Sequence, residues 1–317
     1  MVLSLAERTA ALVKHVNVDQ ILRRTNSGIY LGHSVDLGWG RVYGGQTMAQ
    51  ALSAAQQLAG PDRRVHQFGC HFLRPGDAKE DVEFEADKLA DGKSFGVMHV
   101  RAMQKGKVIL SLTASLQTPE KGLEHSYQHR FNRNGVEAAL RPEWMRPEDL
   151  KSVYDHMQPY LKSIPSSLRP LYEVQQPLEV RPAEFTPPWE TEPRQPVRAN
   201  WVKSRLPLTD DQNVHERLLS YISDWGLLET SIFPHPVGMW SKNIQAASLS
   251  HNIVFHRPFR MDEWLCHAMY SPTSSGGRGY ALGEFWSESG ELIASTSQEG
   301  LIRHLPEEGE VIEKSKL

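Results

Sequence analysis

Alternating apolar and polar positions in the first 120 residues predict a sheet, and one stretch within them predicts a helix. Residues 47–58 are rich in Ala, Gln, Met and Leu and contain neither proline nor a charged side chain, which favours a buried helix. Turn sequences at Asp91-Gly92-Lys93 and Lys105-Gly106-Lys107 separate the last three apolar runs and indicate hairpins. We therefore expect strands at 29–35, 64–73, 82–89, 95–102 and 108–117, after a surface helix within residues 1–21.

The same order of elements returns toward the carboxyl end. We expect strands at 178–184, 199–206, 245–255, 264–270, 280–287 and 292–303, with a helix at 213–225. The two halves also align in sequence, because Arg74-Pro75 matches Arg257-Pro258 at an offset of 183 (257 minus 74). The same offset places Ile109-Leu110 on Leu292-Ile293 and Thr113 on Thr296. Two copies of one α+β unit are the structural expectation.

A proline-rich stretch separates the two copies. Of the 20 prolines in the chain, 11 fall between Pro142 and Pro196, and proline forbids long regular elements. The expected organisation is a first unit at 1–120, a linker or covering segment at 121–197, and a second unit at 198–317.

The predicted helix at 213–225 carries an acid in an apolar setting. Leu218, Leu219, Ile222 and Trp225 recur at helical spacing, so most of the circumference of this helix should be buried. Burying an unpaired carboxylate is costly. Asp224 is therefore either a hydrogen-bonded group near the end of the helix or a group that acts on a substrate.

Composition narrows the classes of function. The 35 basic and 38 acidic side chains nearly cancel, to a net charge of −3, and form no basic run, which argues against a nucleic-acid partner. No apolar run reaches the length of about 20 residues that spans a membrane. Cys70 and Cys266 are too few for a disulfide framework and indicate buried thiols in a reducing compartment. The histidines show no metal-ligand spacing, and we expect neither a metal nor a cofactor.

The last three residues are Ser315-Lys316-Leu317. At the end of a chain, this tripeptide is the address that the peroxisomal import receptor reads. The peroxisome matrix is therefore the expected location.

Several motifs resemble one known family. In the first half these are Val42-Tyr43-Gly44-Gly45-Gln46, His71-Phe72-Leu73-Arg74-Pro75-Gly76-Asp77 and Asp91-Gly92-Lys93-Ser94-Phe95. In the second half they are Ser223-Asp224, Phe255-His256-Arg257-Pro258-Phe259 and Ser295-Thr296-Ser297-Gln298-Glu299-Gly300. Together they resemble the acyl-CoA thioesterase II family and its peroxisomal members. The resemblance implies a double hot-dog fold, in which each sheet wraps a central helix, and hydrolysis of fatty acyl-CoA to free acid and CoA.

The resemblance also implies the catalytic residues. The family's aspartate, hydroxyl and glutamine fall on Asp224, Ser248 and Gln298. Subtracting the repeat offset of 183 takes Ser248 to Val65 and Gln298 to Ser115, and the first helix contains no acid. We therefore expect one active site per chain, and a homo-oligomer because hot-dog sheets commonly pair.

These three groups suit water attack on a thioester. Asp224 can accept a proton from water while Ser248 and Gln298 hold that water in position. The leaving thiol has a pKa of about 8.5 by analogy with cysteine, so it departs with little acid assistance. Backbone amides of Gly44 and Gly45, at the start of the first buried helix, are candidates for stabilising the oxyanion.

Other functions stay open at this point. An enoyl-CoA hydratase of the same fold is one, since Asp210-Asp211-Gln212-Asn213-Val214-His215 partly matches its Asp–His motif, although Gln212 stands where that motif wants Asn. A cap of the following helix is the simpler role for Asp210 or Asp211. A non-catalytic acyl-CoA carrier is a second alternative. Gly92-Lys93-Ser94-Phe95-Gly96 fits the nucleophile-elbow pattern, but it leads into a predicted strand where the elbow needs a helix.

Overall fold

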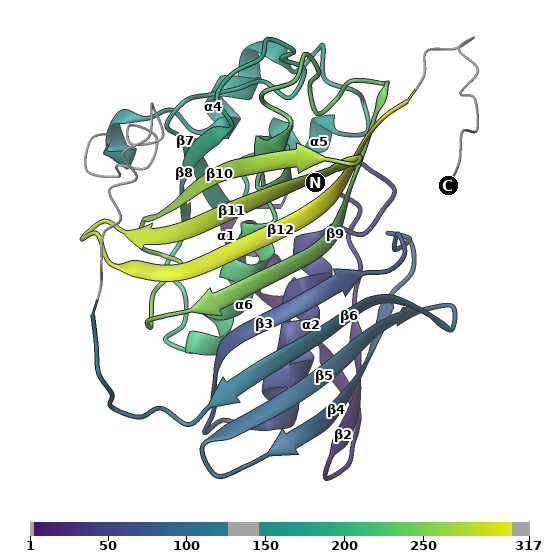
Figure 1. The fold of residues 1–317 in the computed structure, drawn as a ribbon, viewed down its shortest axis with the longest axis vertical. Helices are drawn as coiled ribbons and strands as arrows, with labels where there is room; N and C mark the ends of the chain where they lie inside the picture. Colours follow the sequence, from purple (N-terminus) through teal and green to yellow (C-terminus); the bar gives the residue numbers. More distant parts are fainter. Residues whose placement is uncertain (1–2, 126–145, 306–317) are drawn as a thin grey trace.

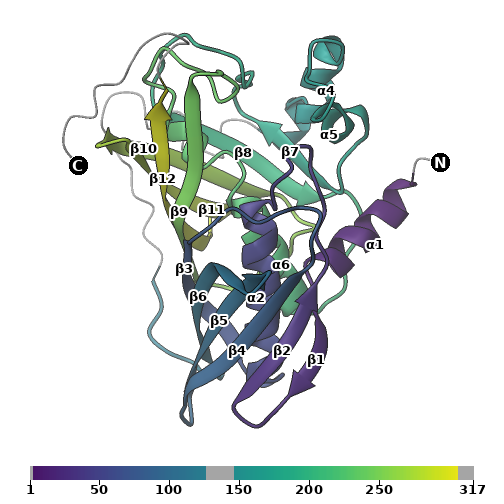
Figure 2. The ribbon, with the colours of Figure 1, turned by 90° about the vertical axis from the view of Figure 1, so that its right-hand side faces the viewer.

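The strands of the chain join into one antiparallel sheet that curves round two helices. The computed structural model describes residues 3–125 and 146–305, and within them the strand order is β1-β2-β4-β5-β6-β3-β9-β12-β11-β10-β8-β7. Figures 1 and 2 show helices α2 (Gly44–Ala59) and α6 (Gln212–Ser223) side by side on the concave side of this sheet.

The first six strands in this order come from the first half of the chain. Their bounds are β1 Asp19–Arg23, β2 Ser27–Gly32, β3 Arg64–Phe72, β4 Val82–Asp91, β5 Phe95–Gln104 and β6 Lys107–Gln117. The six from the second half are β7 Leu178–Pro182, β8 Val197–Ser204, β9 Ile244–Phe255, β10 Leu265–Ser275, β11 Arg278–Ser287 and β12 Leu292–His304. From the centre of the sheet outward, the first half therefore has the spatial order β3-β6-β5-β4-β2-β1, and the second half has the matching order β9-β12-β11-β10-β8-β7.

The two halves meet at the pairing of β3 with β9, and this pairing reveals an approximate two-fold axis. An axis that relates two antiparallel strands must pass where a residue faces its own counterpart. Gly69 faces Asn252 in this register, and the two numbers differ by 183 (252 minus 69), the offset of the sequence repeat. The prediction of two copies of one unit is thereby confirmed.

Helix α2 is almost entirely buried because its side chains are small and uncharged. It contacts β2, β3, β4, β5 and β6 of its own half as well as α6. The two helices are antiparallel. Tyr43 Oη donates to Tyr221 O (3.0 Å) at one end, and Gln56 Nε2 donates to Glu216 Oε2 (2.7 Å) at the other.

The proline-rich region forms a layer over the second half of the sheet. It contains η2 (Pro147–Asp149), α4 (Val153–Met157), η3 (Gln158–Tyr160) and α5 (Arg169–Glu173). Its own small core consists of Met157, Ile164, Leu168 and Tyr172. We call residues 146–177 and 183–196 the cover. Strand β7 lies between these two stretches and pairs with β8 at the edge of the sheet.

One element differs from the sequence expectation. Helix α1 (Leu5–His15) stops before residue 21, and Asp19–Arg23 is the edge strand β1. Val16 and Val18 are buried in the main hydrophobic core, which contains residues of both halves. Gln20 pairs with Tyr30 on β2. Tertiary packing and strand pairing therefore end the helix early, although its sequence allows a longer one.

Both cysteines are buried free thiols, as predicted. Among the described residues no helix has the length and apolar character needed to cross a membrane.

A buried acid between the helices predicts how stability depends on pH. Glu216 is 3% exposed, and burial raises the pKa of its carboxyl from 4.5 to about 8. A raised folded-state pKa gives a contribution that is complete below the unfolded value near 4.5 and is lost as pH rises through about 8.

We therefore expect Glu216→Gln, which keeps an acceptor for Gln56 but cannot ionise, to gain stability relative to the parent as pH rises from 5 to 8. The gain is at most about 1.4 kcal/mol per pH unit. Denaturant unfolding at a series of pH values measures it. A difference between the two proteins that stays level over this range would contradict the assignment of a neutral Glu216.

Candidate active site

Asp224 stands where helix α6 ends. It is the C-cap residue, and Gly226 follows with a φ of +81° that ends the helix. The carboxylate thus lies at the negative end of its own helix dipole. The antiparallel arrangement places the positive end of α2 directly opposite.

Two N–H donors hold the carboxylate. Gln298 Nε2 donates to Asp224 Oδ1 (2.6 Å), and the Gly45 amide donates to Asp224 Oδ2 (3.0 Å). A Cβ atom on Gly44 would lie 2.7 Å from Oδ2, and one on Gly45 would lie 2.1 Å from the Tyr221 carbonyl oxygen. The glycine pair is therefore needed for α6 to approach α2 this closely.

Ser248 and Gln298 come from the neighbouring strands β9 and β12. Gln298 Nε2 also donates to Ser248 Oγ (2.8 Å), so both hydrogens of its amide face the acid and the hydroxyl. The amide oxygen Oε1 is buried and has no hydrogen-bond partner among the described residues. The Ser248 hydroxyl accepts from Gln298 and can still donate its own proton.

A β-bulge brings Ser248 to the inner face of the sheet. His251, Ile253 and Phe255 face inward by strict alternation along β9, and that alternation would turn Ser248 outward. The register shifts between the pairs Glu299–Ser250 and Gly300–Ser248. The extra residue at this shift reverses the alternation, so Ser248 faces the same side as Gln298.

Burial raises the pKa of Asp224 above its ordinary value of 3.8. Hydrogen bonds from Gln298, the Gly45 amide and Ser248 work in the opposite direction but do not cancel the effect of burial. The site therefore holds a carboxylate that is more basic than an exposed aspartate.

Ser223 and His251, which the sequence did not indicate as a pair, form a buried hydrogen bond next to Asp224 and Gln298. Ser223 Oγ lies 3.0 Å from His251 Nε2 and donates to Ser220 O (2.9 Å). His251 faces Gln298 across the pairing of β9 with β12, and burial lowers the pKa of its imidazole to about 3, which keeps it neutral. His251 is thus a buried polar group of the core, and no spacing in the sequence indicates that Ser223 is its partner.

The acid and the hydroxyl open into a cavity of about 810 Å³, which we call the catalytic cavity. Gly44 and Phe72 line it from the first half, and Asp224 and Ser248 line it from the second. The cover adds an apolar wall, which consists of Val153, Met157, Tyr172, Phe185 and Pro188. The sequence indicated a covering segment but not which of its side chains reach the site, because the cover lacks regular periodicity.

The remaining sequence candidates fall elsewhere. Asp211 is the N-cap of α6 and accepts from the Asn213 amide (3.0 Å), as predicted. Strand β5 follows Ser94 directly, so the nucleophile elbow is excluded. The prediction that the Gly45 amide stabilises the oxyanion is wrong, because this amide already donates to Asp224 Oδ2. Residues 315–317 lie outside the described part of the chain.

Comparisons with known proteins agree with this architecture. A family profile described as acyl-CoA thioesterase matches residues 167–301, and one described as acyl-CoA thioesterase N-terminal domain matches residues 35–117. Acyl-CoA thioesterase 2 of Haemophilus influenzae is 36% identical over 282 residues, which cover 89% of this chain and 94% of that protein. Human acyl-coenzyme A thioesterase 8 is 32% identical, with 85% of this chain and 83% of that protein covered.

A solved structure shows the same shape. The crystal structure of the acyl-CoA thioesterase II TesB2 from Mycobacterium marinum superposes with a TM-score of 0.69 at 29% identity. The superposition covers 92% of this chain and 97% of that one.

Proposed function

We propose, on the premise that this chain belongs to the acyl-CoA thioesterase II family, that Asp224, Ser248 and Gln298 direct a water molecule at the thioester carbonyl of a fatty acyl-CoA. The double hot-dog fold and the hydrolysis of acyl-CoA to free acid and CoA, both expected from the resemblance, are confirmed by the matching relatives and structures. The catalytic roles of the three residues are our proposal.

One geometric observation supports these roles. The Gln298 amide joins Asp224 Oδ1 (2.6 Å) and Ser248 Oγ (2.8 Å) on the wall of a cavity. A water between the carboxylate and the hydroxyl would donate one proton to Asp224 and attack with its oxygen lone pair. Attack forms a tetrahedral oxyanion, which expels the CoA thiolate as the carbonyl re-forms. The Gly44 amide, at the start of α2, remains the candidate donor to that oxyanion.

The hydratase alternative loses its support in the sequence. Asp210, the acid of that motif, is exposed and paired with Arg260 (2.6 Å), and His215 is buried in contacts with Thr209 O and the Met261 amide. The carrier alternative is separated from the hydrolase by the first experiment below.

Asp224→Asn should lower kcat by about 10²- to 10⁴-fold, because it removes the general base. The amide oxygen of Asn can still accept from Gly45 or Gln298, so the fold should persist. Release of CoA, followed with a thiol-trapping reagent, measures the rate. Asp210→Asn, a change of the same chemistry at an exposed loop position, should retain full activity. Stoichiometric binding of acyl-CoA without turnover in the parent protein would favour the carrier.

The rate should also follow the ionisation of Asp224. A general base works as the carboxylate, so kcat/KM should fall as pH falls through the pKa of Asp224. Because burial raises that pKa, the midpoint should lie above the ordinary 3.8. A pH profile of kcat/KM tests this. The same limb should be missing from the residual activity of Asp224→Asn, and its persistence there would assign it to another group.

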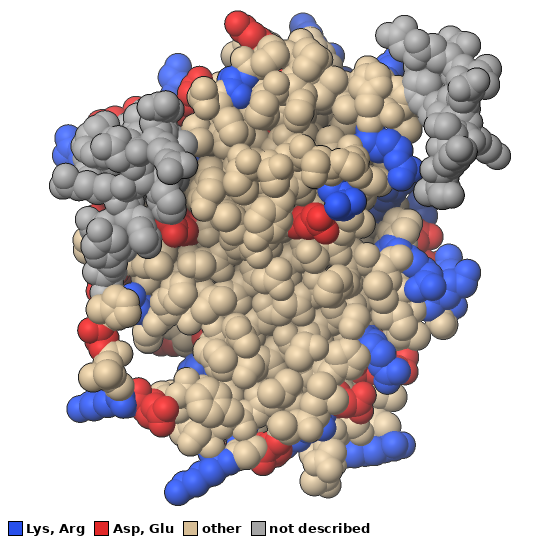
Figure 3. All heavy atoms as spheres, in the orientation of Figure 1, with Lys and Arg blue, Asp and Glu red and all other residues tan. Residues whose placement is uncertain are grey.

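We propose that copies of the chain associate through the convex face of the sheet. Figure 3 shows a broad area without Lys, Arg, Asp or Glu over the central strands, which is interrupted where Glu299 of β12 pairs with Arg278 of β11. Outward residues there include Gln67, Thr113, Asn252 and Ser297. A face with few charges and several hydrogen-bonding side chains suits pairing with a second copy of itself.

We propose a peroxisomal location for this enzyme. Ser315-Lys316-Leu317 matches the import address. A yeast relative that is 22% identical over 82% of this chain is named peroxisomal acyl-coenzyme A thioester hydrolase 1. Residues 306–317 fused behind a fluorescent protein should direct it to peroxisomes, and the same fusion without Ser315-Lys316-Leu317 should stay in the cytosol. Identical distributions of the two fusions would contradict the proposal.

A further inference from the structure

A second cavity, of about 960 Å³, lies at the opposite ends of the two central helices. It shares no lining residue with the catalytic cavity. Helix α1, strand β1, the last turns of α2 and the loop before α6 line it, and it is open to solvent on one side. Its lining includes Ala10, Val13, Gln56, Leu208 and Arg217.

The approximate two-fold axis relates this second cavity to the catalytic one. Aligning the helices at their first residues, Gly44 and Gln212, gives a difference of 168 (212 minus 44). That difference takes Asp224 to Gln56 (224 minus 168), and Gln56 lines the second cavity as Asp224 lines the first. Likewise, the loop at 206–211 corresponds to the loop before α2.

The second cavity lacks the groups for hydrolysis. An amide, Gln56, stands in the place of the acid. On the strands, the counterparts of Ser248 and Gln298 are Val65 and Ser115. The repeat therefore preserves a cavity at this end but not the three proposed catalytic residues.

A buried cation that forms no ion pair among the described residues lines this space, and Asp211 acts on its charge only from a greater distance. Arg217 is 7% exposed, and its Nη1 donates to two neutral acceptors, Asn17 Oδ1 (3.1 Å) and Ser53 Oγ (3.2 Å). Its Nε is buried without a partner, and no ion pair involves Arg217 in residues 3–125 and 146–305. The neighbouring Glu216 does not balance the charge at pH 7, because burial raises the pKa of that carboxyl to about 8.

Burying a guanidinium that has no direct ion pair costs free energy, and an anion bound to it in the cavity would recover part of that cost. Lys14 and Arg23 add positive charge to the lining, and Asp211 is the single acid within it. Apolar side chains from α1 and the loop before α6, among them Ala10, Val13 and Leu208, line one part of the wall, and polar side chains such as Gln20, Gln57 and Asn213 line the rest. A long apolar chain that ends in a negative group matches this distribution.

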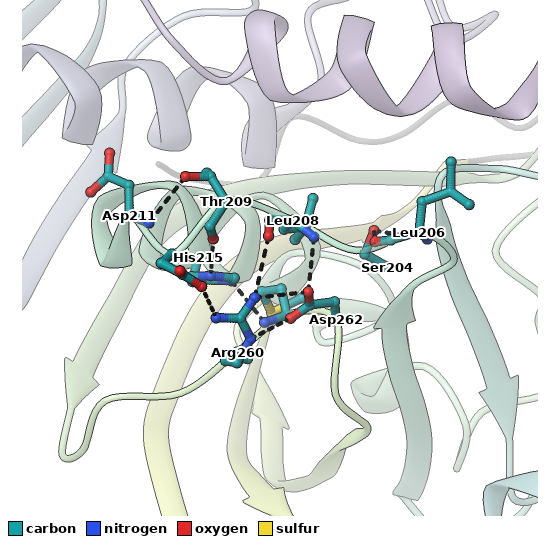
Figure 4. A network of polar contacts seen from close by, with 10 residues as sticks. Ser204, Leu206, Leu208, Thr209, Asp211, His215, Arg260 and Asp262 are labelled. Carbon is teal, nitrogen blue, oxygen red and sulfur yellow. Dashed lines mark hydrogen bonds and ion pairs between the residues drawn. The ribbon is translucent and has the colours of Figure 1, made fainter.

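The loop at 206–211, which forms one wall, is held in place by hydrogen bonds and ion pairs within the protein. Figure 4 shows Arg260 bound to Asp262 (2.9 Å) and to Leu208 O (3.2 Å). Arg260 also pairs with Asp210 (2.6 Å). His215 reaches Thr209 O (2.9 Å) and accepts from the Met261 amide (2.9 Å). The wall is thus pre-formed, which lowers the cost of ordering it on binding.

We propose that the second cavity is a non-catalytic binding site for a long-chain fatty acid, with the carboxylate on Arg217 and the chain along α1 and the 206–209 loop. The fatty acid is the product that the family's reaction releases, so the choice of ligand rests on the hydrolase function. The binding itself is measured without turnover.

Equilibrium binding of palmitate to the purified full chain tests this. The parent should bind two molecules per chain, one in each cavity. Arg217→Gln should weaken the second site at least tenfold, and Arg217→Lys, which keeps the charge, should weaken it less. Hexadecanol, which lacks the carboxylate, should not occupy the second site.

A cavity-filling pair provides the matched control. Ala10 lies on an exposed position of α1 and lines the second cavity, whereas its neighbour Ala11 is exposed and does not. Ala10→Trp should bind one palmitate per chain and hydrolyse acyl-CoA at the parental initial rate, while Ala11→Trp should bind two. This pair decides the matter even if Arg217→Gln fails to fold.

Equal stoichiometry in Ala10→Trp and Ala11→Trp, or a single palmitate per parent chain, would overturn the proposal. So would displacement of palmitate from the second site by CoA alone, since that would assign the cavity to a nucleotide phosphate. An inactive protein that still binds two molecules of palmitate would overturn the hydrolase function and leave the second site standing.

Discussion

The contact between the C-terminal end of α6 and the N-terminal end of α2 determines the properties of the proposed active site. Asp224 ends α6, where the carbonyl groups of its own helix disfavour a negative charge, and it faces the first amides of α2, which favour one. The contact from the Gly45 amide to Asp224 Oδ2 is 3.0 Å long and crosses from one half of the chain to the other. Because burial still dominates, the acid remains more basic than an exposed aspartate. Its protonation therefore depends on how closely the halves approach, and Gly44 and Gly45 permit that approach.

Two antiparallel helices necessarily create two such meetings, and the chain uses them differently. At the catalytic end the partner of the acid is a backbone amide with no side chain in the way. At the other end Glu216 receives a hydrogen bond from Gln56 and Arg217 lies beside it. The connection from helix to strand also differs, since residues 60–63 join α2 to β3 whereas residues 224–243 join α6 to β9. The longer connection contributes Trp225, Leu228 and Trp240 to the catalytic cavity, so the two cavities have diverged in their walls as well as in their chemistry.

The accuracy of the sequence predictions follows from how local each signal is. Alternation along single strands predicts β4, β5, β6 and β11 to within two residues, because each of these strands has one buried face. The small, uncharged composition of α2 likewise suffices to bury it. The failure at Asp19–Arg23 has a non-local cause, because this segment forms an edge strand through its pairing with β2. Ser223 and His251 meet only when α6 packs on β9, and no pattern within either segment indicates that contact.

The orientation of Ser248 cannot be predicted from strand alternation. The repeat nevertheless shows that the bulge which sets this orientation occurs in both halves. Strict alternation along β9 would turn its side chain away from Gln298, and only the bulge at Leu249 reverses this. In β3 the register shifts between Val65 and Gln67, which makes His66 the extra residue. The two bulges are separated by 183 residues (249 minus 66), the offset of the repeat. The bulge therefore belongs to the shared backbone of both copies, and the first copy carries it with Val65 buried on the inner face. It follows that the geometry for presenting a side chain beside the helix end is common to both halves, and that the halves differ in the residues placed on it, Ser248 in the second and Val65 in the first.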